Sequence, residues 1–212
     1  FFKVNQVQPS SIDLSLSREC YEIEFSFLSP NHKVRDKLKD NVIRKIDLNN
    51  DYTFKKNKIY LIKLNEELDL NENIFGNCNP KSSTGRLDIF CRTIVDYTDE
   101  YEKVPKNYKG EIFLEVTSRS FDIIFRAGNR LNQLRLVNNY HNYVSDKELN
   151  ELQLDNKIVF IENNSNYKID KGLKVSVDLS NISQPVAYSA KLNTPKIDFN
   201  KINFHNIGDY WD

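Results

Sequence analysis

The stretch Tyr21-Glu22-Ile23-Glu24-Phe25-Ser26-Phe27 alternates apolar and polar side chains over its whole length. Successive side chains of a β-strand point to opposite faces of a sheet, so this alternation predicts a strand with one buried face. Runs of the same kind recur along the chain, separated by Gly, Pro, Asn and Asp, at residues 58–64, 87–95, 111–117, 121–126, 131–137 and 157–162. The sequence therefore predicts a chain built mainly from short strands.

Helical signals are few. The sequence predicts one short helix over residues 33–42. Ser145 with Glu148 three residues later is a capping box, in which each side chain bonds the other residue's backbone N–H, and it predicts a second helix through about residue 153. Many short strands with few helices indicate a mainly β fold, a barrel or a sandwich with a few short helices.

Composition narrows the class of protein. The chain has 212 residues, 30 basic and 30 acidic side chains and 39% hydrophobic residues, which suffices for the core of one or two domains. Proteins that bind nucleic acid or membrane surfaces usually carry a basic excess, so the neutral balance argues against both partners. No signal peptide is visible in the given sequence, and no apolar run approaches the roughly 18 residues that a membrane span needs. Three cysteines without close spacing give no disulfide framework. We therefore expect a cytoplasmic protein.

The least strand-like stretch is residues 79–88, Asn-Pro-Lys-Ser-Ser-Thr-Gly-Arg-Leu-Asp. Arg86 offers a planar fork of donors and Lys81 a point charge. Ser82 and Ser83 add short hydroxyl donors. Such groups bind phosphate, although their spacing is not that of a Walker loop. The alternative is a solvated turn whose charges are incidental.

Glu115 is a second candidate. On a strand over residues 110–116, the aliphatic side chains at positions 112, 114 and 116 face one side, and Glu111, Phe113 and Glu115 face the other. A carboxylate beside an aromatic ring could act as a proton shuttle. On spacing alone, the simpler alternative is a solvent-facing strand edge.

Gln133 is a third candidate, in a segment where a turn at Gly128 leads into a strand. Among apolar neighbours, Gln133 could reach the amide or phosphate of a ligand. It could equally satisfy a backbone group inside a barrel, and its spacing does not separate the two roles.

Metal-ligand patterns are missing from the sequence. His32, His141 and His205 lie far apart, without ligand spacing. A zinc deaminase would need His-x-Glu and Pro-Cys-x-x-Cys, and a serine hydrolase would need something like Gly-x-Ser-x-Gly; neither pattern occurs. We therefore assign no metal ligand and expect surface or core roles for the histidines.

An internal repeat and the first residues bear on domain organisation. Ser11-Ile-Asp-Leu-Ser15 recurs as Ser176-Val-Asp-Leu-Ser180, which suggests a duplication whose second copy starts near residue 170. The sequence contains no Met and begins Phe-Phe. We expect it to be a piece of a longer gene product.

Four short elements, in this order, resemble the dCTP deaminase branch of the dUTPase-like superfamily. They are Gln8-Pro-Ser-Ser-Ile-Asp-Leu14, Pro80-Lys-Ser-Ser-Thr-Gly-Arg-Leu87, Gly110-Glu-Ile-Phe-Leu-Glu115 and Asn129-Arg-Leu-Asn-Gln-Leu134. Their order and separations across residues 8–137 are similar to those of the family. The resemblance is closest to the long form, in which two family-like halves are fused, and this supports the repeat.

The resemblance implies a dUTPase-like distorted β-barrel or jelly roll. It implies a homotrimer, or a trimer of two-domain chains, with active sites between subunits. The implied activity is zinc-independent hydrolysis of dCTP to dUTP and ammonia in pyrimidine deoxynucleotide metabolism, with Mg²⁺ on the triphosphate and dTTP as a possible regulator. By position, Glu115 corresponds to the proton-shuttling carboxylate, and Ser82 and Arg86 to catalytic residues that orient base and phosphates. The set expected to bind substrate comprises Lys81, Ser82, Ser83, Arg86 and Gln133.

The resemblance also divides the chain. Residues 1–145 correspond to a first dCTP-deaminase-like domain whose N-terminal segment is missing. Residues 146–170 correspond to a linker with helix and strand, and residues 171–212 to the start of a second, truncated dUTPase-like domain.

The sequence departs from the family pattern near the candidate site. Asp88 stands where the family has Gly, and a longer, charged segment at residues 97–108 replaces the family's Asp-Pro-Gly-Phe loop. We therefore hypothesise that a complete site combines Ser82 and Arg86 with strand residues of the other half, in which case Glu115 is a vestige. Two alternatives stay open: a dUTP pyrophosphatase or bifunctional deaminase, and a non-catalytic half that binds nucleotide or scaffolds a trimer.

Overall fold

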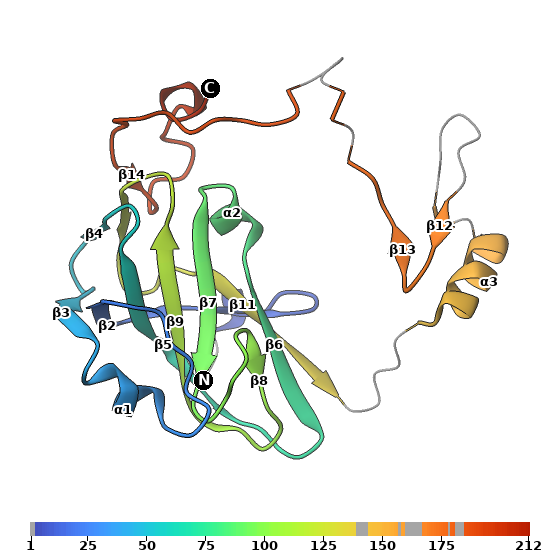
Figure 1. Ribbon diagram of the computed structural model, residues 1–212, viewed down its shortest axis with the longest axis horizontal. Helices are drawn as coiled ribbons and strands as arrows, with labels where there is room; N and C mark the ends of the chain where they lie inside the picture. Colours follow the sequence, from blue (N-terminus) through green and yellow to red (C-terminus); the bar gives the residue numbers. More distant parts are fainter. Residues whose placement is uncertain (1–2, 139–143, 157, 160–166, 178, 181–184) are drawn as a thin grey trace. The chain divides into compact units, whose positions relative to one another are not determined.

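The computed structural model describes residues 3–138, 144–156, 158–159, 167–177, 179–180 and 185–212. The chain forms two compact units, one of Phe1–Asn139 with Ser189–Asp212 and the other of Tyr140–Tyr188. Figure 1 shows the first unit as layers of strands and the second as one helix beside a short hairpin.

A five-stranded antiparallel sheet is the largest layer of the first unit (Figure 1). Its order is β3 (Val42–Asp47), β2 (Leu16–Ile23), β5 (Ile59–Asp69), β9 (Lys109–Ser118) and β7 (Ile89–Val95). Side chains of β9 enter different clusters in alternation. Ile112, Leu114 and Val116 pack in the main core, whereas Phe113 packs in a smaller cluster. The alternation predicted for residues 110–116 is therefore confirmed.

Two smaller sheets enclose the main core with the five-stranded one. One has the order β1 (Ile12–Leu14), β11 (Asn132–Asn138), β6 (Ile74–Pro80) and β8 (Lys103–Val104), and the other β14 (Ile197–Asp198), β10 (Ile123–Phe125) and β4 (Tyr52–Phe54). Leu14, Leu114 and Ile123, one from each sheet, are buried in a single cluster. Burial of apolar surface between sheets is the dominant favourable term in such a fold. The predicted mainly β class is confirmed.

The helices are short. α1 (Val34–Leu38) occupies the first part of the helix predicted at 33–42, and it ends early because β3 begins at Val42. α2 (Ser82–Gly85) is a single turn between β6 and β7, and η1 (Val4–Gln6) and η2 (Ile207–Asp209) are 3-10 turns. No helix in the described part of the chain is long and apolar enough to cross a membrane.

The second unit contains α3 (Asp146–Asn156), β12 (Lys168–Ile169) and β13 (Leu173–Lys174). The predicted capping box is confirmed: the Ser145 N–H donates to Glu148 Oε2 at 2.7 Å, and the Glu148 N–H donates to Ser145 Oγ at 3.3 Å. The Asp146 carboxylate accepts two N–H groups of the hairpin turn, from Lys171 and Gly172, both at 2.8 Å. The hairpin is thereby tied to the first turn of α3.

The strand predicted at residues 21–27 is only partly confirmed. β2 begins earlier, at Leu16, and ends at Ile23. Beyond that point Asn41 Oδ1 accepts the N–H groups of Glu24 and Phe25, both at 3.1 Å, so the backbone leaves the sheet. Phe25 is consequently 55% exposed. The strand predicted at 157–162 lies largely outside the described residues.

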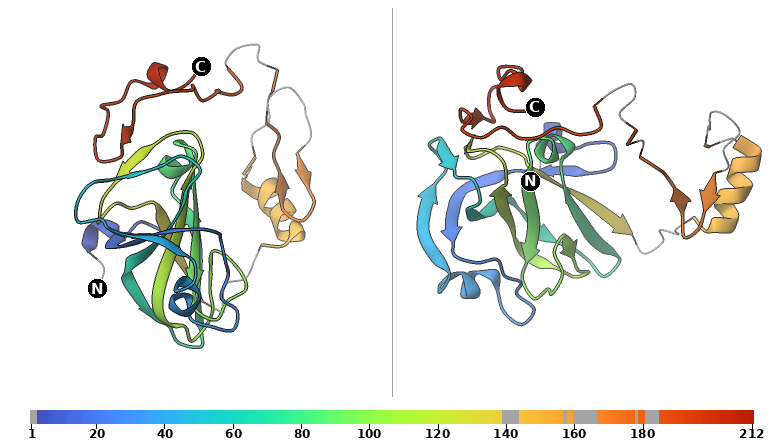
Figure 2. Two further views of the ribbon diagram at one scale, coloured as in Figure 1. Left: turned by 60° about the vertical axis from the view of Figure 1, so that its left-hand side comes forward. Right: turned by 45° about the horizontal axis from the view of Figure 1, so that its top comes forward.

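The segment Ser189–Asp212 packs on the first unit. Its strand β14 pairs in parallel with β10. Phe121 contacts the rings of Tyr210 and Trp211, with centroids 5.5 and 5.0 Å apart. Figures 1 and 2 show that the segment crosses the end of the sheets at which α2 lies. The C-terminal segment therefore completes one sheet of the first unit and covers that end.

Candidate functional site

The turn between β6 and β7 carries most of the predicted site residues, and the start of β11 fixes its shape. The Lys81 N–H donates to the Leu131 carbonyl at 2.9 Å, and Thr84 Oγ1 donates to the same carbonyl at 2.8 Å. Thr84 is fully buried and anchors the turn. The exposed residues of the predicted set in this turn are Ser82, Ser83 and Arg86.

The helical geometry of α2 gives this turn two faces. Residues four apart in a helix share a face, so Ser82 lies with Arg86, the C-cap residue of α2. Ser83 and Leu87 line a neighbouring cavity together with Lys81, whereas Ser82 and Arg86 do not. No described residue forms an ion pair with Arg86 or a hydrogen bond with the Ser82 hydroxyl. Both side chains are therefore available to an external ligand.

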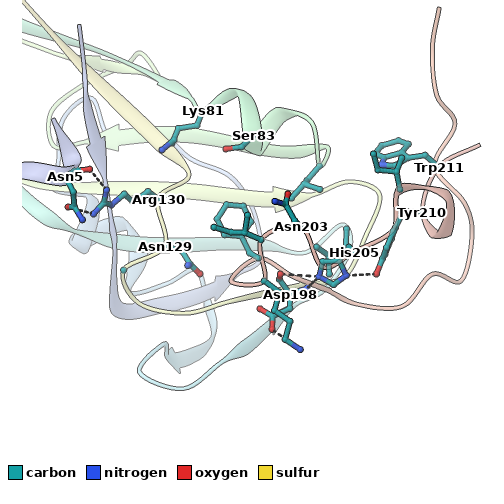
Figure 3. Close-up of a pocket in the computed structure, with 17 residues that line it drawn as sticks. Asn5, Lys81, Ser83, Asn129, Arg130, Asp198, Asn203, His205, Tyr210 and Trp211 are labelled. Carbon is teal, nitrogen blue, oxygen red and sulfur yellow. Dashed lines mark hydrogen bonds and ion pairs between the residues drawn. The ribbon is translucent and has the colours of Figure 1, made fainter. Parts of the chain in front are cut away.

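A cavity of about 790 Å³ lies beside the turn, entirely within the first unit (Figure 3). One wall comes from the turn and from the connection between β10 and β11, and the opposite wall comes from the C-terminal segment. Its charged lining residues are the three cations Lys81, Arg130 and Lys201 and the carboxylate of Asp198. The aromatic lining residues are Phe199, Tyr210 and Trp211. A cavity with these properties suits an anionic ligand that also has an apolar part.

Asp13 holds Lys81 in place. The Lys81 ammonium forms an ion pair with Asp13 Oδ2, and the Asp13 side chain is 3% exposed. Asp13 lies opposite Gln133 in the pairing of β1 with β11, so Gln133 is next to this ion pair on the same face of the sheet. Gln133 Oε1 accepts a hydrogen bond from Ser11 Oγ at 3.2 Å, a side-chain rather than a backbone group.

His205 ties the C-terminal wall together (Figure 3). Its Nε2 accepts the backbone N–H of Asp198 at 3.0 Å, and its Nδ1 lies 3.0 Å from the Tyr210 hydroxyl. Nε2 also lies 3.2 Å from the backbone carbonyl oxygen of Asp198, so both ring nitrogens have hydrogen-bonding partners in this wall. His205 therefore has a structural role in this wall. Within the described ranges, no group of three or more His, Cys, Asp and Glu side chains could hold a metal ion.

Glu115 lies in a separate, buried cluster. Its side chain is 3% exposed. Glu115 Oε1 accepts from Arg92 Nε at 3.1 Å and Nη2 at 2.6 Å, and Oε2 accepts from Ser26 Oγ at 2.5 Å. The Arg92 guanidinium lies over the Tyr101 ring, 4.0 Å from its centroid. The alternative of a solvent-facing strand edge is wrong, because β9 lies inside the sheet and Arg92 of the adjacent strand covers the carboxylate.

The three cysteines are not nucleophile candidates. Cys20, Cys78 and Cys91 are free thiols buried in the core. Burial raises the pKa of all three, that of Cys78 to about 12, so the reactive thiolate is suppressed.

The structure joins some of the predicted residues and separates one. Lys81, Ser82, Ser83 and Arg86 share a turn beside Gln133, whereas Glu115 bonds to none of them. Arg92 and Arg130 were not among the predicted site residues: Arg92 lies outside the four family-like elements, and Arg130 lies in the last of them without a predicted role. Arg92 is identified by its pairing opposite Glu115 across two strands, and Arg130 by its place on the cavity wall. The lining residues of the C-terminal segment give no sequence signal either, because they reach the cavity only through long-range packing.

Two family models match the chain. The 2'-deoxycytidine 5'-triphosphate deaminase (DCD) N-terminal domain matches residues 1–140, and the C-terminal domain of the same family matches residues 145–212. The chain is also similar to the crystal structure of 2'-deoxycytidine 5'-triphosphate deaminase from Agrobacterium tumefaciens, with 33% sequence identity and a TM-score of 0.88. That match covers 100% of this chain and 63% of the other, so the chain spans 63% of the length of that relative. No curated protein matches the sequence.

Proposed function

The chain belongs to the 2'-deoxycytidine 5'-triphosphate deaminase family, and on that premise we propose that it serves the hydrolytic deamination of dCTP to dUTP and ammonia. The observation that carries the proposal is the turn after β6. The side chains of Ser82, Ser83 and Arg86 are exposed there and have no partner in the described part of the chain. Of the three, Ser83 also lines the cavity that holds the cations. Hydroxyl and guanidinium donors of this kind bind phosphate through charge-assisted hydrogen bonds.

The substrate-binding set of this proposal comprises Lys81, Ser82, Ser83, Arg86 and Gln133. Arg86 presents a planar fork to a phosphate, and Ser82, on the same face, helps to orient the base and the phosphates. Lys81 contributes a positive charge whose position Asp13 fixes. Gln133, beside that ion pair, offers amide N–H donors.

The chemical step requires proton transfer at two points. Water attacks C4 of cytosine and gives one proton to a carboxylate, which passes that proton to N3. The carboxylate then takes the second proton, from the new hydroxyl group on C4, and passes it to the departing amine. The C4–N bond breaks, ammonia leaves, and the attacking oxygen becomes the carbonyl oxygen of uracil. Donors near C4 stabilise the charge that develops during attack. By resemblance, the carboxylate corresponds to Glu115.

The contacts of Glu115 favour a different source for that carboxylate. Three hydrogen bonds, two from Arg92 and one from Ser26, already occupy most of the roughly four acceptor positions of this carboxylate, and its side chain is 3% exposed, so water has little access to it. A reaction that displaced Arg92 would separate the carboxylate from its counter-charge. Leaving a buried charge without its partner costs about 3–5 kcal/mol. In this proposal the turn of Ser82 and Arg86 therefore supplies substrate binding, and the proton-transferring carboxylate comes from the other family-like half.

A substitution at Glu115 in the full-length protein tests this division of labour. Glu115→Gln keeps the shape of the side chain and a hydrogen bond to Arg92, and we expect kcat for ammonia release to stay within about threefold, because general acid–base catalysis is not removed. A positioned proton shuttle is worth about 10²–10⁴-fold in rate. A fall of that size, with dCTP affinity retained, would assign the proton transfer to Glu115.

One assay separates the deaminase from its rivals. We expect ammonia release from dCTP without pyrophosphate release from dUTP. Pyrophosphate from dUTP alone would identify a dUTP pyrophosphatase, and both products would identify a bifunctional enzyme. Nucleotide binding without turnover by the full-length protein would identify a binding or scaffold role.

Mg²⁺ fits this site as a companion of the triphosphate. The cavity wall offers a single carboxylate, Asp198, and Mg²⁺ commonly binds nucleotides through phosphate oxygens together with one or two carboxylates. When bound, Mg²⁺ neutralises part of the phosphate charge, while Arg86 and Lys81 hold the remainder.

The proposal also covers assembly, regulation and domain division. It describes a cytoplasmic homotrimer, or a trimer of two-domain chains, that dTTP regulates. It keeps the division into a first domain at 1–145, a linker at 146–170 and the start of a second domain at 171–212. Light scattering on the full-length protein measures its assembly state, and a mass other than that of a trimer would contradict this part.

A further inference from the structure

Arg130 lies on the wall of the cavity next to Lys81 and Ser83, and Asn5 fixes its orientation (Figure 3). Its Nη1 donates to the backbone carbonyl of Asn5, and its Nη2 donates to Asn5 Oδ1, both at 2.7 Å. Two hydrogen bonds from different amino groups to one residue restrict the rotation of the guanidinium. The fork is therefore already oriented before any ligand arrives.

The charge of Arg130 is not neutralised by the protein. Both of its partner oxygens belong to neutral groups of Asn5, and no carboxylate in the described part of the chain forms an ion pair with it. A guanidinium has five N–H donors, so the two bonds to Asn5 leave others unused. Lys81 differs in this respect, because Asp13 already balances its charge.

The rest of the cavity has the same electrostatic character. Across from Arg130, the C-terminal segment contributes Lys201, whose Nζ is 3.8 Å from Asp198 Oδ2, so this loose pair is self-balancing. Lys201 is paired with Asp198, and Lys81 is paired with Asp13. Among the charged residues that line the cavity, Arg130 is therefore the one without a counter-charge in the described part of the chain. A ligand with negative charge would be attracted to this wall.

We propose that Arg130 is a phosphate-binding residue, and that the polyphosphate of a nucleoside triphosphate passes from the face of Ser82 and Arg86, around Ser83, into this cavity. The inference rests on the proposed function and adds to it a residue and a wall of the site. A cavity of about 790 Å³ is within the range of about 300–1,000 Å³ that nucleotide-sized ligands occupy. Charge-assisted hydrogen bonds from a pre-oriented guanidinium are among the strongest available to phosphate.

The test compares Arg130→Ala with Arg126→Ala in the full-length protein. Arg126 is a matched control because it is an exposed arginine of the same connection that does not line the cavity. We expect Arg130→Ala to raise the KM for dCTP by about 10- to 150-fold, the equivalent of a charge-assisted bond, with kcat within about threefold. Arg126→Ala should leave both values unchanged.

Binding of inorganic triphosphate, measured by calorimetry, makes the test independent of catalysis. We expect Arg130→Ala to weaken this binding by a similar factor and Arg130→Lys, which keeps the charge but loses the fork, to weaken it less. Asn5→Ala removes the bond to Oδ1 and keeps the bond to the backbone carbonyl, so it should weaken binding only a few-fold. Melting temperatures identify any variant that fails to fold.

The outcomes separate this inference from the proposed function. Normal deamination with an unchanged KM and unchanged triphosphate affinity in Arg130→Ala would overturn the inference and leave the function standing. Equal weakening in Arg130→Ala and Arg126→Ala would also overturn it, because the effect would then be one of net charge. Triphosphate binding that depends on Arg130, in a wild-type protein that releases no ammonia, would support the phosphate site and overturn the proposed function.

Discussion

Two groups of charged side chains in this chain have opposite designs. Around Glu115, Arg92 and Ser26 donate three hydrogen bonds to a buried carboxylate, and Tyr101 packs against the guanidinium of Arg92. In the turn after β6, by contrast, the exposed Arg86 has no protein partner in the described residues. The side chains of the first group bond to one another within the fold, whereas the donors of Arg86 in the second group are available to a ligand.

The difference shows why a residue in a family motif has to be judged by its contacts. A buried charge is tolerated when it is paired and hydrogen-bonded, so we expect removal of a partner of Glu115 to lower the stability of the fold. An exposed arginine contributes little to stability and can bind a ligand without an internal bond being broken. Stability and activity should therefore respond to different substitutions in the two groups.

The largest expected effect comes from removing Arg92. Arg92→Ala leaves the Glu115 carboxylate buried without its counter-charge, which should cost about 3 kcal/mol of the free energy of unfolding. In a protein of this size the melting temperature would fall by about 6–12 °C, measured by circular dichroism. Arg18→Ala, which breaks the exposed pair with Asp47, is the control and should cost less than about 0.5 kcal/mol. Similar losses of stability in Arg92→Ala and Arg18→Ala would contradict the view that burial of the Glu115 pair causes the effect.

Removing Arg86 should have the opposite profile. Arg86→Ala is expected to lower kcat/KM for dCTP by about 10- to 150-fold, because a charge-assisted bond to phosphate is worth about 1.5–3 kcal/mol. The melting temperature should stay the same, since no described residue depends on Arg86 for an ion pair. Arg86→Lys keeps the charge and loses the planar fork, so its kcat/KM should lie between those of the wild type and of Arg86→Ala. A lowered melting temperature with unchanged kcat/KM would show that Arg86 belongs to the structural group.

The smallest expected effect concerns a third, half-exposed group. Arg35 bonds Glu111 at 2.5 Å and Glu19 at 2.7 Å on the outer face of the five-stranded sheet. Hydrogen bonding from Arg35 lowers the pKa of Glu111 from 4.5 to about 2. A lowered pKa in the folded state means stability that is present above about pH 4.5 and is lost as the pH falls toward 2. With solvent screening we expect about 1 kcal/mol.

The pH dependence can be measured by urea unfolding of the wild type and Glu111→Gln. At pH 6 the free energy of unfolding of the wild type should exceed that of Glu111→Gln. This difference between the two proteins should shrink toward zero as the pH falls from 4.5 to 2. Glu100→Gln, at an exposed position, is the control and should show no such trend. A difference that does not change with pH would exclude the ion pair as its cause.

The sequence predicted those strands whose faces differ in polarity. The run at 111–117 alternates cleanly, and β9 follows it. The pattern did not indicate how many layers cover a strand: Glu22, expected on a solvated face, is 5% exposed and pairs with Arg44 at 3.3 Å. Burial of both faces depends on neighbours that are distant in the sequence.

β6 could not be predicted from local preference. Its residues, Ile74-Phe-Gly-Asn-Cys-Asn-Pro80, are rich in types that favour turns. Pairing with β11 and β8 overrides that preference, and Gly76 has a packing reason, since a Cβ there would come within 2.7 Å of Leu134 Cδ1. Tertiary contacts of this kind leave no signal in a single sequence.

The candidate site was predictable where it is local. The turn of Lys81, Ser82, Ser83 and Arg86 is one continuous stretch, so its composition alone indicated phosphate. The fixed orientation of Arg130 depends on Asn5, and the opposite cavity wall depends on the C-terminal segment. These contacts join positions far apart in the sequence, and no periodicity or motif reports them.

The parallel pairing of β10 with β14 also sets the order in which the protein can be completed during synthesis. Phe121 and Phe125 leave the ribosome after β4, but β14 and the aromatic residues Phe199, Tyr210 and Trp211, which pack against them, follow only after the whole second unit. At translation rates of about 5–20 residues per second, that delay lasts several seconds. During it the nascent first unit exposes an aromatic face, so this end of the molecule is where a chaperone would act and where a stalled chain would aggregate.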